Sequence, residues 1–213
     1  MWTWTCNRFD NEGTASIFPS GALVGCWMEY QKDRMERCVI HLLGASGSGT
    51  STLGRFVAGQ MDSFFMDTDD YYWMPTDPQY TTSRPISERL ALMRRDIATQ
   101  KKVVISGSLV DWGDELIPLF TLAIRVETAT AVRIARLRAR ERVRFGSRLD
   151  PDGDMYAHHE KFIRWASDYD DGDVHMRSRA MHDHWQKQLA CPLVTVDGNL
   201  PVEANWEMIK PYL

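Results

Sequence analysis

The sequence predicts a doubly wound α/β fold, in which helices cover both faces of a parallel sheet of about five strands. Short apolar runs of strand length alternate along the chain with longer segments whose apolar residues recur at helical spacing. The apolar runs are continuous, which is typical of strands that are buried on both faces of a parallel sheet. Together these two observations predict three layers, α/β/α.

Five apolar runs are expected to form the strands: 38–43, 63–67, 103–105, 119–126 and 193–196. Helical spacing predicts a helix from about residue 50 to near Gly59, and others at 86–97, 129–145 and 202–209. Gly146 is expected to end the 129–145 helix. A short helix is expected within 153–172 and a longer one over 174–190, while 75–85, rich in Pro, Thr and Asp, is expected to be a loop.

The composition fits one globular domain with an appendage. The chain has 213 residues, of which 44% are hydrophobic and 25% charged, and its net charge is −4. This charge argues against nucleic acid or an acidic membrane as a partner. We find no apolar run of membrane-spanning length and no signal-peptide pattern, and the four cysteines form no CxxC pair. A cytoplasmic protein with reduced thiols is expected.

Residues 1–37 differ from the rest of the chain because they contain three tryptophans and no sustained hydrophobic period. We expect them to be a poorly ordered N-terminal extension, and 38–213 to be the folded domain. An alternative interpretation takes Met28 or Met35 as the start of translation.

A glycine-rich loop follows the first predicted strand and precedes the first predicted helix. Its glycines and hydroxyls have the spacing of a phosphate-binding loop. Glycines let successive backbone N–H groups point at phosphate oxygens, and the helix adds its positive end. We expect the whole loop to bind the phosphates of ATP, and the Ser51 hydroxyl to bind Mg²⁺. The loop residues are Gly44, Ala45, Ser46, Gly47, Ser48, Gly49, Thr50 and Ser51.

Thr50 occupies the loop position at which the motif has a lysine. A threonine forms hydrogen bonds but brings no charge to the outer phosphates. The sequence therefore indicates nucleotide binding more strongly than catalysis, unless another cation replaces the lysine. Arg55 and the arginines of the 129–145 helix are candidates.

Carboxylates follow the second predicted strand. Ligands of open parallel sheets bind outside the carboxyl ends of the strands, so these side chains are expected near the glycine loop. Asp67 is expected to support Mg²⁺, and Asp69 to accept the proton of a substrate hydroxyl; Asp70 is an alternative for either task. A solvated acidic turn is the competing interpretation.

A strand, a glycine loop, a helix and a second strand that ends in Asp67-Thr68-Asp69 resemble the P-loop small-molecule kinases. The acidic segment is similar to that of shikimate kinase, and the loop resembles a subgroup described as adenylate-kinase-like. The resemblance implies the P-loop NTPase fold, a small lid, and use of ATP and Mg²⁺. The third predicted strand ends in Ser106-Gly107-Ser108, where adenylate kinases have Asp-Gly.

The 129–145 helix carries arginines at spacings of three and four residues, so Arg133, Arg136, Arg140 and Arg144 share one stripe. In the kinase family, such a helix and a following lid bring arginines to the phosphates, which the guanidinium group binds bidentately. We expect catalytic roles for Arg140 and Arg144, and nucleotide binding by Arg136 and Arg148. Glu141 is expected to orient one of them, and 148–156 to be the lid.

The sequence therefore predicts an ATP-dependent kinase that acts on a small-molecule acceptor, either a nucleoside monophosphate or a hydroxylated metabolite. Arg84 and Arg89 are candidate anchors for an acidic acceptor. The alternatives are a nucleotide-binding switch or scaffold with little phosphotransfer, which the absent lysine favours, and a plain NTP hydrolase.

Overall fold

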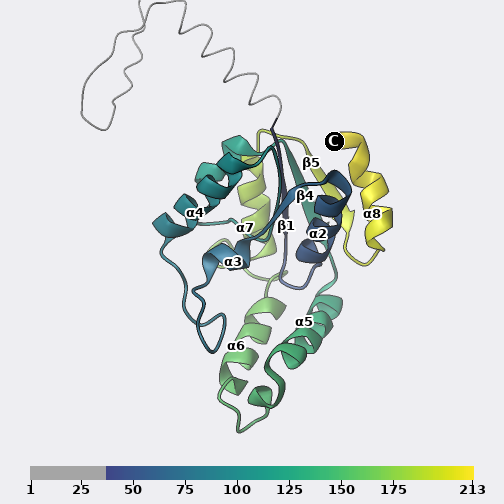
Figure 1. Ribbon diagram of the computed structural model, residues 1–213. Helices are drawn as coiled ribbons and strands as arrows, with labels where there is room; N and C mark the ends of the chain where they lie inside the picture. Colours follow the sequence, from purple (N-terminus) through teal and green to yellow (C-terminus); the bar gives the residue numbers. More distant parts are fainter. Residues whose placement is uncertain (1–36) are drawn as a thin grey trace, which may run out of the picture. The chain divides into compact units, whose positions relative to one another are not determined.

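The computed structural model describes residues 37–213 (Figure 1), so the expectation of an N-terminal extension lies outside the described residues except for Arg37. Five strands form one sheet in which all neighbours are parallel, in the order β2-β3-β1-β4-β5. They are β1 (Cys38–Gly44), β2 (Phe64–Asp67), β3 (Lys102–Ser106), β4 (Leu122–Glu127) and β5 (Leu193–Asp197). The predicted five-stranded parallel sheet is confirmed.

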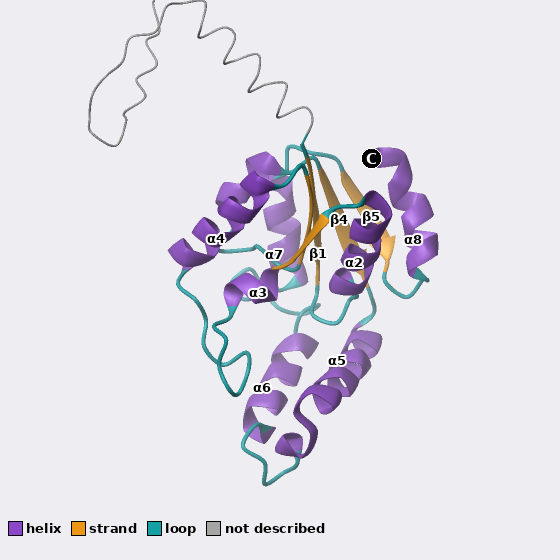
Figure 2. Ribbon diagram, in the orientation of Figure 1, coloured by secondary structure: helices purple, strands orange, loops and turns teal. Residues whose placement is uncertain are grey.

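Helices cover both faces of the sheet (Figure 2). They are α2 (Thr50–Met61), α3 (Thr68–Tyr72), α4 (Ile86–Thr99), α5 (Thr130–Phe145), α6 (Tyr156–Ser167), α7 (Arg179–Trp185) and α8 (Val202–Ile209). Short 3₁₀ helices form at η1 (Asp114–Leu119), η2 (Gly146–Leu149), η3 (Gln186–Gln188) and η4 (Lys210–Tyr212).

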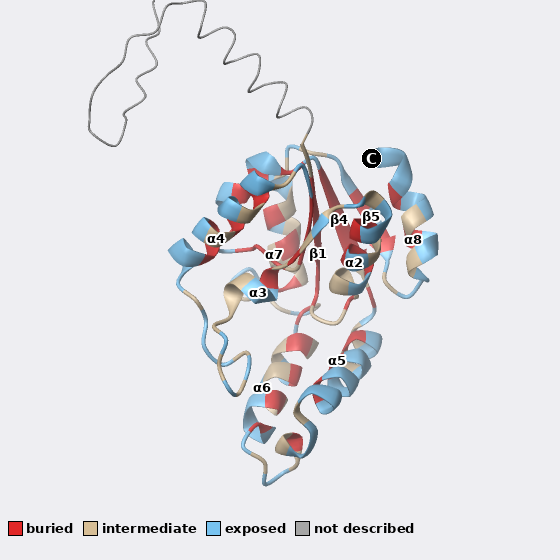
Figure 3. Ribbon diagram, in the orientation of Figure 1, coloured by how far each residue is buried: buried red, intermediate tan, exposed pale blue. Residues whose placement is uncertain are grey.

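The core has two parts, one on each face of the sheet, because strand side chains alternate between the faces. On one face, Val39 and Leu43 pack with Met93 of α4 and Trp185 of α7. On the other face, strand residues pack with Leu53 and Val57 of α2 and Ile209 of α8. Figure 3 shows the strands largely buried and the outer sides of the helices exposed. This is the three-layer arrangement that the sequence predicts.

Helices α5 and α6 lie side by side beyond the carboxyl ends of the strands (Figure 1). A small cluster of Leu137, Ile163 and Ala166 joins them. The segment between them begins with η2 and includes the predicted lid. The arginine-rich α5 therefore starts at the sheet and extends away from it.

The predicted helix over 174–190 is wrong in extent, because α7 covers only Arg179–Trp185. Ser178 has an extended backbone and its side chain accepts from the N–H of Met181, so it caps the helix there. Helix α3, whose N-cap is Asp67, is not among the predicted helices. Within residues 37–213, none of the helices is both long enough and apolar enough to cross a membrane.

Candidate functional site

The glycine loop joins the end of β1 to the start of α2, at the centre of the sheet. Strands β3 and β4 flank β1 on either side, so the loop lies where the strand order reverses, the usual ligand site of such sheets. Gly47 and Gly49 have φ angles of 81° and 104°, which favour glycine. A Cβ on Gly44 would lie 2.6 Å from the carbonyl oxygen of Val126. The backbone conformation and the close packing therefore both require glycine in this loop.

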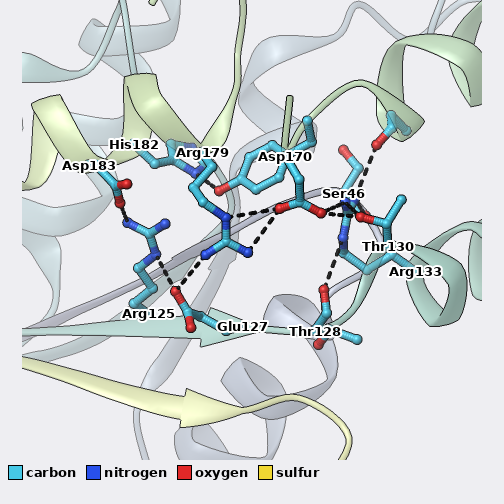
Figure 4. Close-up of polar contacts among 12 residues, drawn as sticks. Ser46, Arg125, Glu127, Thr128, Thr130, Arg133, Asp170, Arg179, His182 and Asp183 are labelled. Atoms are coloured by element: carbon cyan, nitrogen blue, oxygen red, sulfur yellow. Dashed lines mark hydrogen bonds and ion pairs between the residues drawn. The ribbon is translucent and has the colours of Figure 1, made fainter. Parts of the chain in front are cut away.

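Side chains from α5 and from the segment between β4 and α5 hold the loop in place (Figure 4). The Thr128 hydroxyl donates to the Ser48 carbonyl oxygen at 2.9 Å. Arg133 is fully buried and donates to the carbonyl oxygens of Ser46 at 3.4 Å, Thr128 at 3.1 Å and Ala166 at 3.1 Å. A loop held through its carbonyl groups keeps its N–H groups available for a ligand.

The free polar groups of the loop fit a phosphate. The N–H groups of Ser46, Gly47 and Gly49 have no hydrogen-bond partner within residues 37–213, whereas that of Ser48 donates to Ala45 at 3.0 Å. The buried hydroxyl of Ser48 likewise lacks a partner among the described residues. The twelve-residue helix α2 adds the positive end of its dipole at the same place. These groups form a site suited to an anion.

The acidic strand end lies at the same edge of the sheet. Asp67 is the last residue of β2 and pairs in register with Ser106 of β3, which in turn pairs with Leu42 of β1. The Asp67 carboxylate accepts from the N–H of Asp69 at 3.2 Å and lies 3.8 Å from the guanidinium of Arg55. Arg55, a candidate replacement for the loop lysine, thus lies close to Asp67, the residue expected to support Mg²⁺.

Asp69 lies close to several charged groups. Asp69 is exposed to solvent, but nearby protein atoms partly desolvate its carboxylate. This desolvation is the largest cause of a raised pKa for Asp69, and the negative charge of Asp67 adds to it. The positive charges of Arg177, Arg140 and Arg144 lower the pKa in turn. The structure thus brings the predicted acceptor-binding carboxylate close to two of the predicted arginines.

Glu141 orients those two arginines. Its carboxylate accepts from Arg140 Nε at 3.0 Å and from Arg144 Nη1 at 3.1 Å, and its side chain is only 9% exposed. Arg144 also lies over the ring of Tyr80, with the guanidinium carbon 4.4 Å from the ring centroid. Glu141 therefore holds both arginines, where one was expected.

The two arginines expected to bind nucleotide have other partners in this structure. Arg136 donates to the carbonyl oxygens of Ser48 at 3.5 Å and Gly198 at 3.0 Å, so it connects the glycine loop to the segment after β5. Arg148 donates to the carboxylates of Asp154 and Asp77, which raise the pKa of its guanidinium. Its nucleotide-binding role remains a prediction.

One further arginine, which is not among the predicted site residues, lies at the loop. Arg177, just before α7, donates from Nη2 to the Ser46 hydroxyl at 2.7 Å. These two residues line a small recess together with Trp165, Ala166 and Tyr169. Arg177 lies 131 positions from Ser46, inside a segment predicted to be helix. No local pattern singles it out.

A further arginine lies among the aromatic residues that follow β2. Arg89 of α4 is buried, and its guanidinium carbon lies 3.7 Å from the ring centroid of Tyr72 and 5.4 Å from that of Trp112. Its Nε donates to the carbonyl oxygen of Arg84, and no ion pair to a carboxylate is present among the described residues. Arg84, the other candidate anchor for an acidic acceptor, differs from Arg89 because it has a carboxylate partner, Glu88, at 3.8 Å.

Known proteins resemble this chain in sequence and in structure, although no protein-family model matches it. Similar solved structures include the following two. One is a "putative kinase" from Chloroflexus aurantiacus J-10-fl, 19% identical with a TM-score of 0.51, covering 83% of this chain and 96% of that one. The other is shikimate kinase from Acinetobacter baumannii in complex with shikimate, 12% identical with a TM-score of 0.47, covering 85% and 98%.

At 19% identity, the likeness to the Chloroflexus protein shows the fold alone, and it agrees with the predicted α/β class. The sequence likeness goes further. The chain is 37% identical over 174 residues to the uncharacterized protein YqaC of Bacillus subtilis (strain 168), covering 82% of this chain and 96% of YqaC. The chain therefore belongs to the same protein family as YqaC.

Proposed function

We propose that this protein is a Mg²⁺-dependent kinase that transfers the γ-phosphoryl group of ATP to a hydroxyl or phosphate oxygen of a small acceptor. The observation that carries the proposal is the placement of Asp69 within the electrostatic reach of Arg140, Arg144 and Arg177, at the sheet edge that holds the glycine loop. Phosphoryl transfer needs an oriented acceptor oxygen and compensation of phosphate charge, and this arrangement offers both.

The chain's own residues divide the work of the reaction. The unpaired N–H groups of the loop bind phosphate oxygens, and Ser51 and Asp67 would hold Mg²⁺. When bound, this ion would neutralise part of the charge of the outer phosphates. Hard cations of this kind need only one or two protein carboxylates when phosphates and water complete the shell, so the residues present fit.

Asp69 acts on the acceptor. It accepts the hydroxyl proton while the acceptor oxygen forms a bond to the γ-phosphorus and the bond to the bridging oxygen breaks, which releases ADP. The raised pKa of Asp69 suits proton acceptance, because a stronger base takes the proton more readily. Arg140 and Arg144, which Glu141 holds, stabilise the charge on the transferred group.

The acceptor class follows from Arg89. A buried cation without a carboxylate partner is costly, and an anionic group on a ligand would compensate it. Arg89 contacts Tyr72 of α3, the helix that begins with Thr68 and includes Asp69. We therefore infer an acceptor that carries a carboxylate or phosphate besides the hydroxyl or phosphate oxygen that is phosphorylated.

The test is ADP release from ATP and Mg²⁺ against a panel of nucleoside monophosphates and hydroxylated carboxylic acids, together with neutral analogues of the acids. Acceptor-dependent release is expected, stronger for the anionic acceptors. Asp69→Asn should lower kcat by about 100-fold, within the usual range for loss of an acid or base. Asp62→Asn is the matched control, because Asp62 is exposed and has the left-handed conformation that asparagine tolerates.

Two other outcomes would contradict the proposal. ADP release that is independent of any acceptor and survives Asp69→Asn would indicate a plain NTP hydrolase. Tight ATP binding without turnover, unchanged by Thr50→Lys, would indicate a nucleotide-binding switch or scaffold, which Thr50 favours as the second candidate function.

A further inference from the structure

The arginines around the glycine loop differ in the partners to which their guanidinium groups donate hydrogen bonds. Arg133 and Arg136 donate to backbone carbonyls of the loop and its neighbours. Arg55 pairs with Asp67. Arg177, in contrast, makes its only hydrogen bond within residues 37–213 to the Ser46 hydroxyl. A guanidinium has five N–H donors, so Arg177 keeps most of them for a ligand.

Arg177 also lies at the junction between the loop and the acceptor side of the site. Its guanidinium carbon is 4.5 Å from the ring centroid of Trp165 in α6. Its positive charge interacts with the negative charge of Asp69. The loop has no lysine that could take this role, because Thr50 occupies the lysine position. The guanidinium therefore connects the phosphate-binding loop electrostatically to the carboxylate proposed to bind the acceptor.

Hydrogen bonds and ion pairs fix the chain directly after Arg177. Ser178 is fully buried and its hydroxyl donates to the Asp173 carbonyl oxygen. The backbone N–H of Arg179 donates to Tyr169 at 2.8 Å, and its side chain pairs with Asp170 at 2.9 Å and Glu127 at 3.1 Å. Asp170 also accepts from the buried Arg133 that braces the loop. One polar network thus positions both the loop and Arg177.

We propose that Arg177 supplies the positive charge for the outer phosphates of the nucleotide that the loop itself lacks at Thr50. The inference rests on the proposed function for its role in catalysis, but its role in nucleotide binding can be tested without turnover. Arg177 would bind the γ-phosphate oxygens through its free N–H groups, beside Ser46. Burial of the guanidinium lowers its pKa, and Asp69 acts in the opposite direction. In such surroundings an ionic hydrogen bond to phosphate is stronger than in water.

The primary experiment measures the dissociation constants of ATP and ADP by calorimetry in the full-length protein. Arg177→Met is expected to weaken ATP binding by about 10- to 100-fold and ADP binding much less, which is typical for loss of a charge-assisted hydrogen bond to one phosphate group. Arg177→Lys should retain part of the preference for ATP. Thr50→Lys in the Arg177→Met background should restore part of it, because lysine then provides the charge from the loop.

Arg164→Met is the matched control. Arg164 is on α6, is exposed and makes no side-chain contact to the loop in the described part of the chain. Its substitution should leave both dissociation constants unchanged. An unchanged ratio of the ATP and ADP constants in Arg177→Met would overturn the proposal.

A second measurement avoids substitution, in case Arg177→Met does not fold. Arginine modification by phenylglyoxal in the native protein, quantified by mass spectrometry, should be slower at Arg177 with ATP than with ADP, whereas Arg164 should react equally. Equal reaction of Arg177 with both nucleotides would overturn the proposal. If ATP and ADP bind as expected but no acceptor is phosphorylated, the proposed function fails while the role of Arg177 in binding stands.

Discussion

Arg148 Nη1 lies 2.9 Å from Asp77 Oδ1 and joins two segments that are 71 positions apart in the sequence. Arg148 belongs to η2, between α5 and α6, and Asp77 to the loop after α3. The contact of Arg144 with Tyr80 connects α5 to the same loop. The predicted lid and the loop after α3 therefore contact each other.

This connection predicts a shared effect on the acceptor. Asp77→Asn and Arg148→Met should each raise the KM of the acceptor by about 3- to 10-fold, because loops that close over a substrate contribute to its binding. The double variant should be no worse than either single variant, since the two residues act as a pair. Steady-state kinetics at varied acceptor concentration measure this. Additive effects would show that the residues act separately.

Glu141→Gln should lower kcat by about 10-fold, because glutamine retains an acceptor oxygen but loses the charge that fixes Arg140 and Arg144. Glu160→Gln is the control, since Glu160 pairs at 3.2 Å with Arg138, an arginine outside the proposed site. Rates of acceptor-dependent ADP release distinguish the two. Equal rates in both variants would refute the orienting role of Glu141.

Two buried histidines predict acid sensitivity. His41 donates from Nε2 to the Gly107 carbonyl at 2.9 Å, and His182 lies between the hydroxyls of Ser108 at 3.1 Å and Tyr169 at 2.7 Å. Desolvation by burial lowers the pKa of His41 to about 4 and that of His182 to about 3. In the unfolded chain both would titrate near 6.5.

Below this value the unfolded state takes up protons that the folded state does not, so stability is retained above pH ~6.5 and is lost as the pH falls. The free energy of unfolding should fall by roughly 1.4 kcal/mol per pH unit for each histidine between pH ~6.5 and ~4. The raised pKa of Asp69 opposes this in part. Urea unfolding at several pH values should show a smaller slope for His182→Gln than for His184→Gln, the exposed control.

Gly107 should not tolerate a side chain. Its φ is 118°, and a Cβ there would lie 1.9 Å from the Thr68 hydroxyl oxygen. Gly107→Ala should therefore destabilise the protein by several kcal/mol, on the order of an overpacked core. Gly146→Ala is the comparison, because Gly146 also has a positive φ of 55°, but a Cβ there would meet no described atom within 4 Å. Similar melting temperatures of the two variants would contradict this account.

The fold was largely predictable from the sequence, because strand burial and helix amphipathicity are local patterns. Each of the five apolar runs overlaps one of the five strands, although the run 119–126 begins too early, because Leu119 belongs to η1 and β4 begins at Leu122. The arginine-rich helix ends at Phe145, and Gly146 is its C-cap, as expected. Helix α7 was not predictable in extent, since a cap at Ser178 stops it at a point that hydrophobic spacing does not mark. The position of Asp67 at the edge that holds the loop followed from the parallel topology.

Three features could be identified without the folded structure, since each is a contiguous motif: the glycine loop, the acidic strand end and the absence of a loop lysine at Thr50. The different partners of the arginines, in contrast, became visible only in the folded chain. Arg133 and Arg136 hold backbone carbonyls, Arg148 binds carboxylates, and Arg177 reaches the Ser46 hydroxyl from far along the chain. Helical spacing predicts on which face of a helix an arginine lies. Its partners depend on which buried and charged groups of other segments pack against that face.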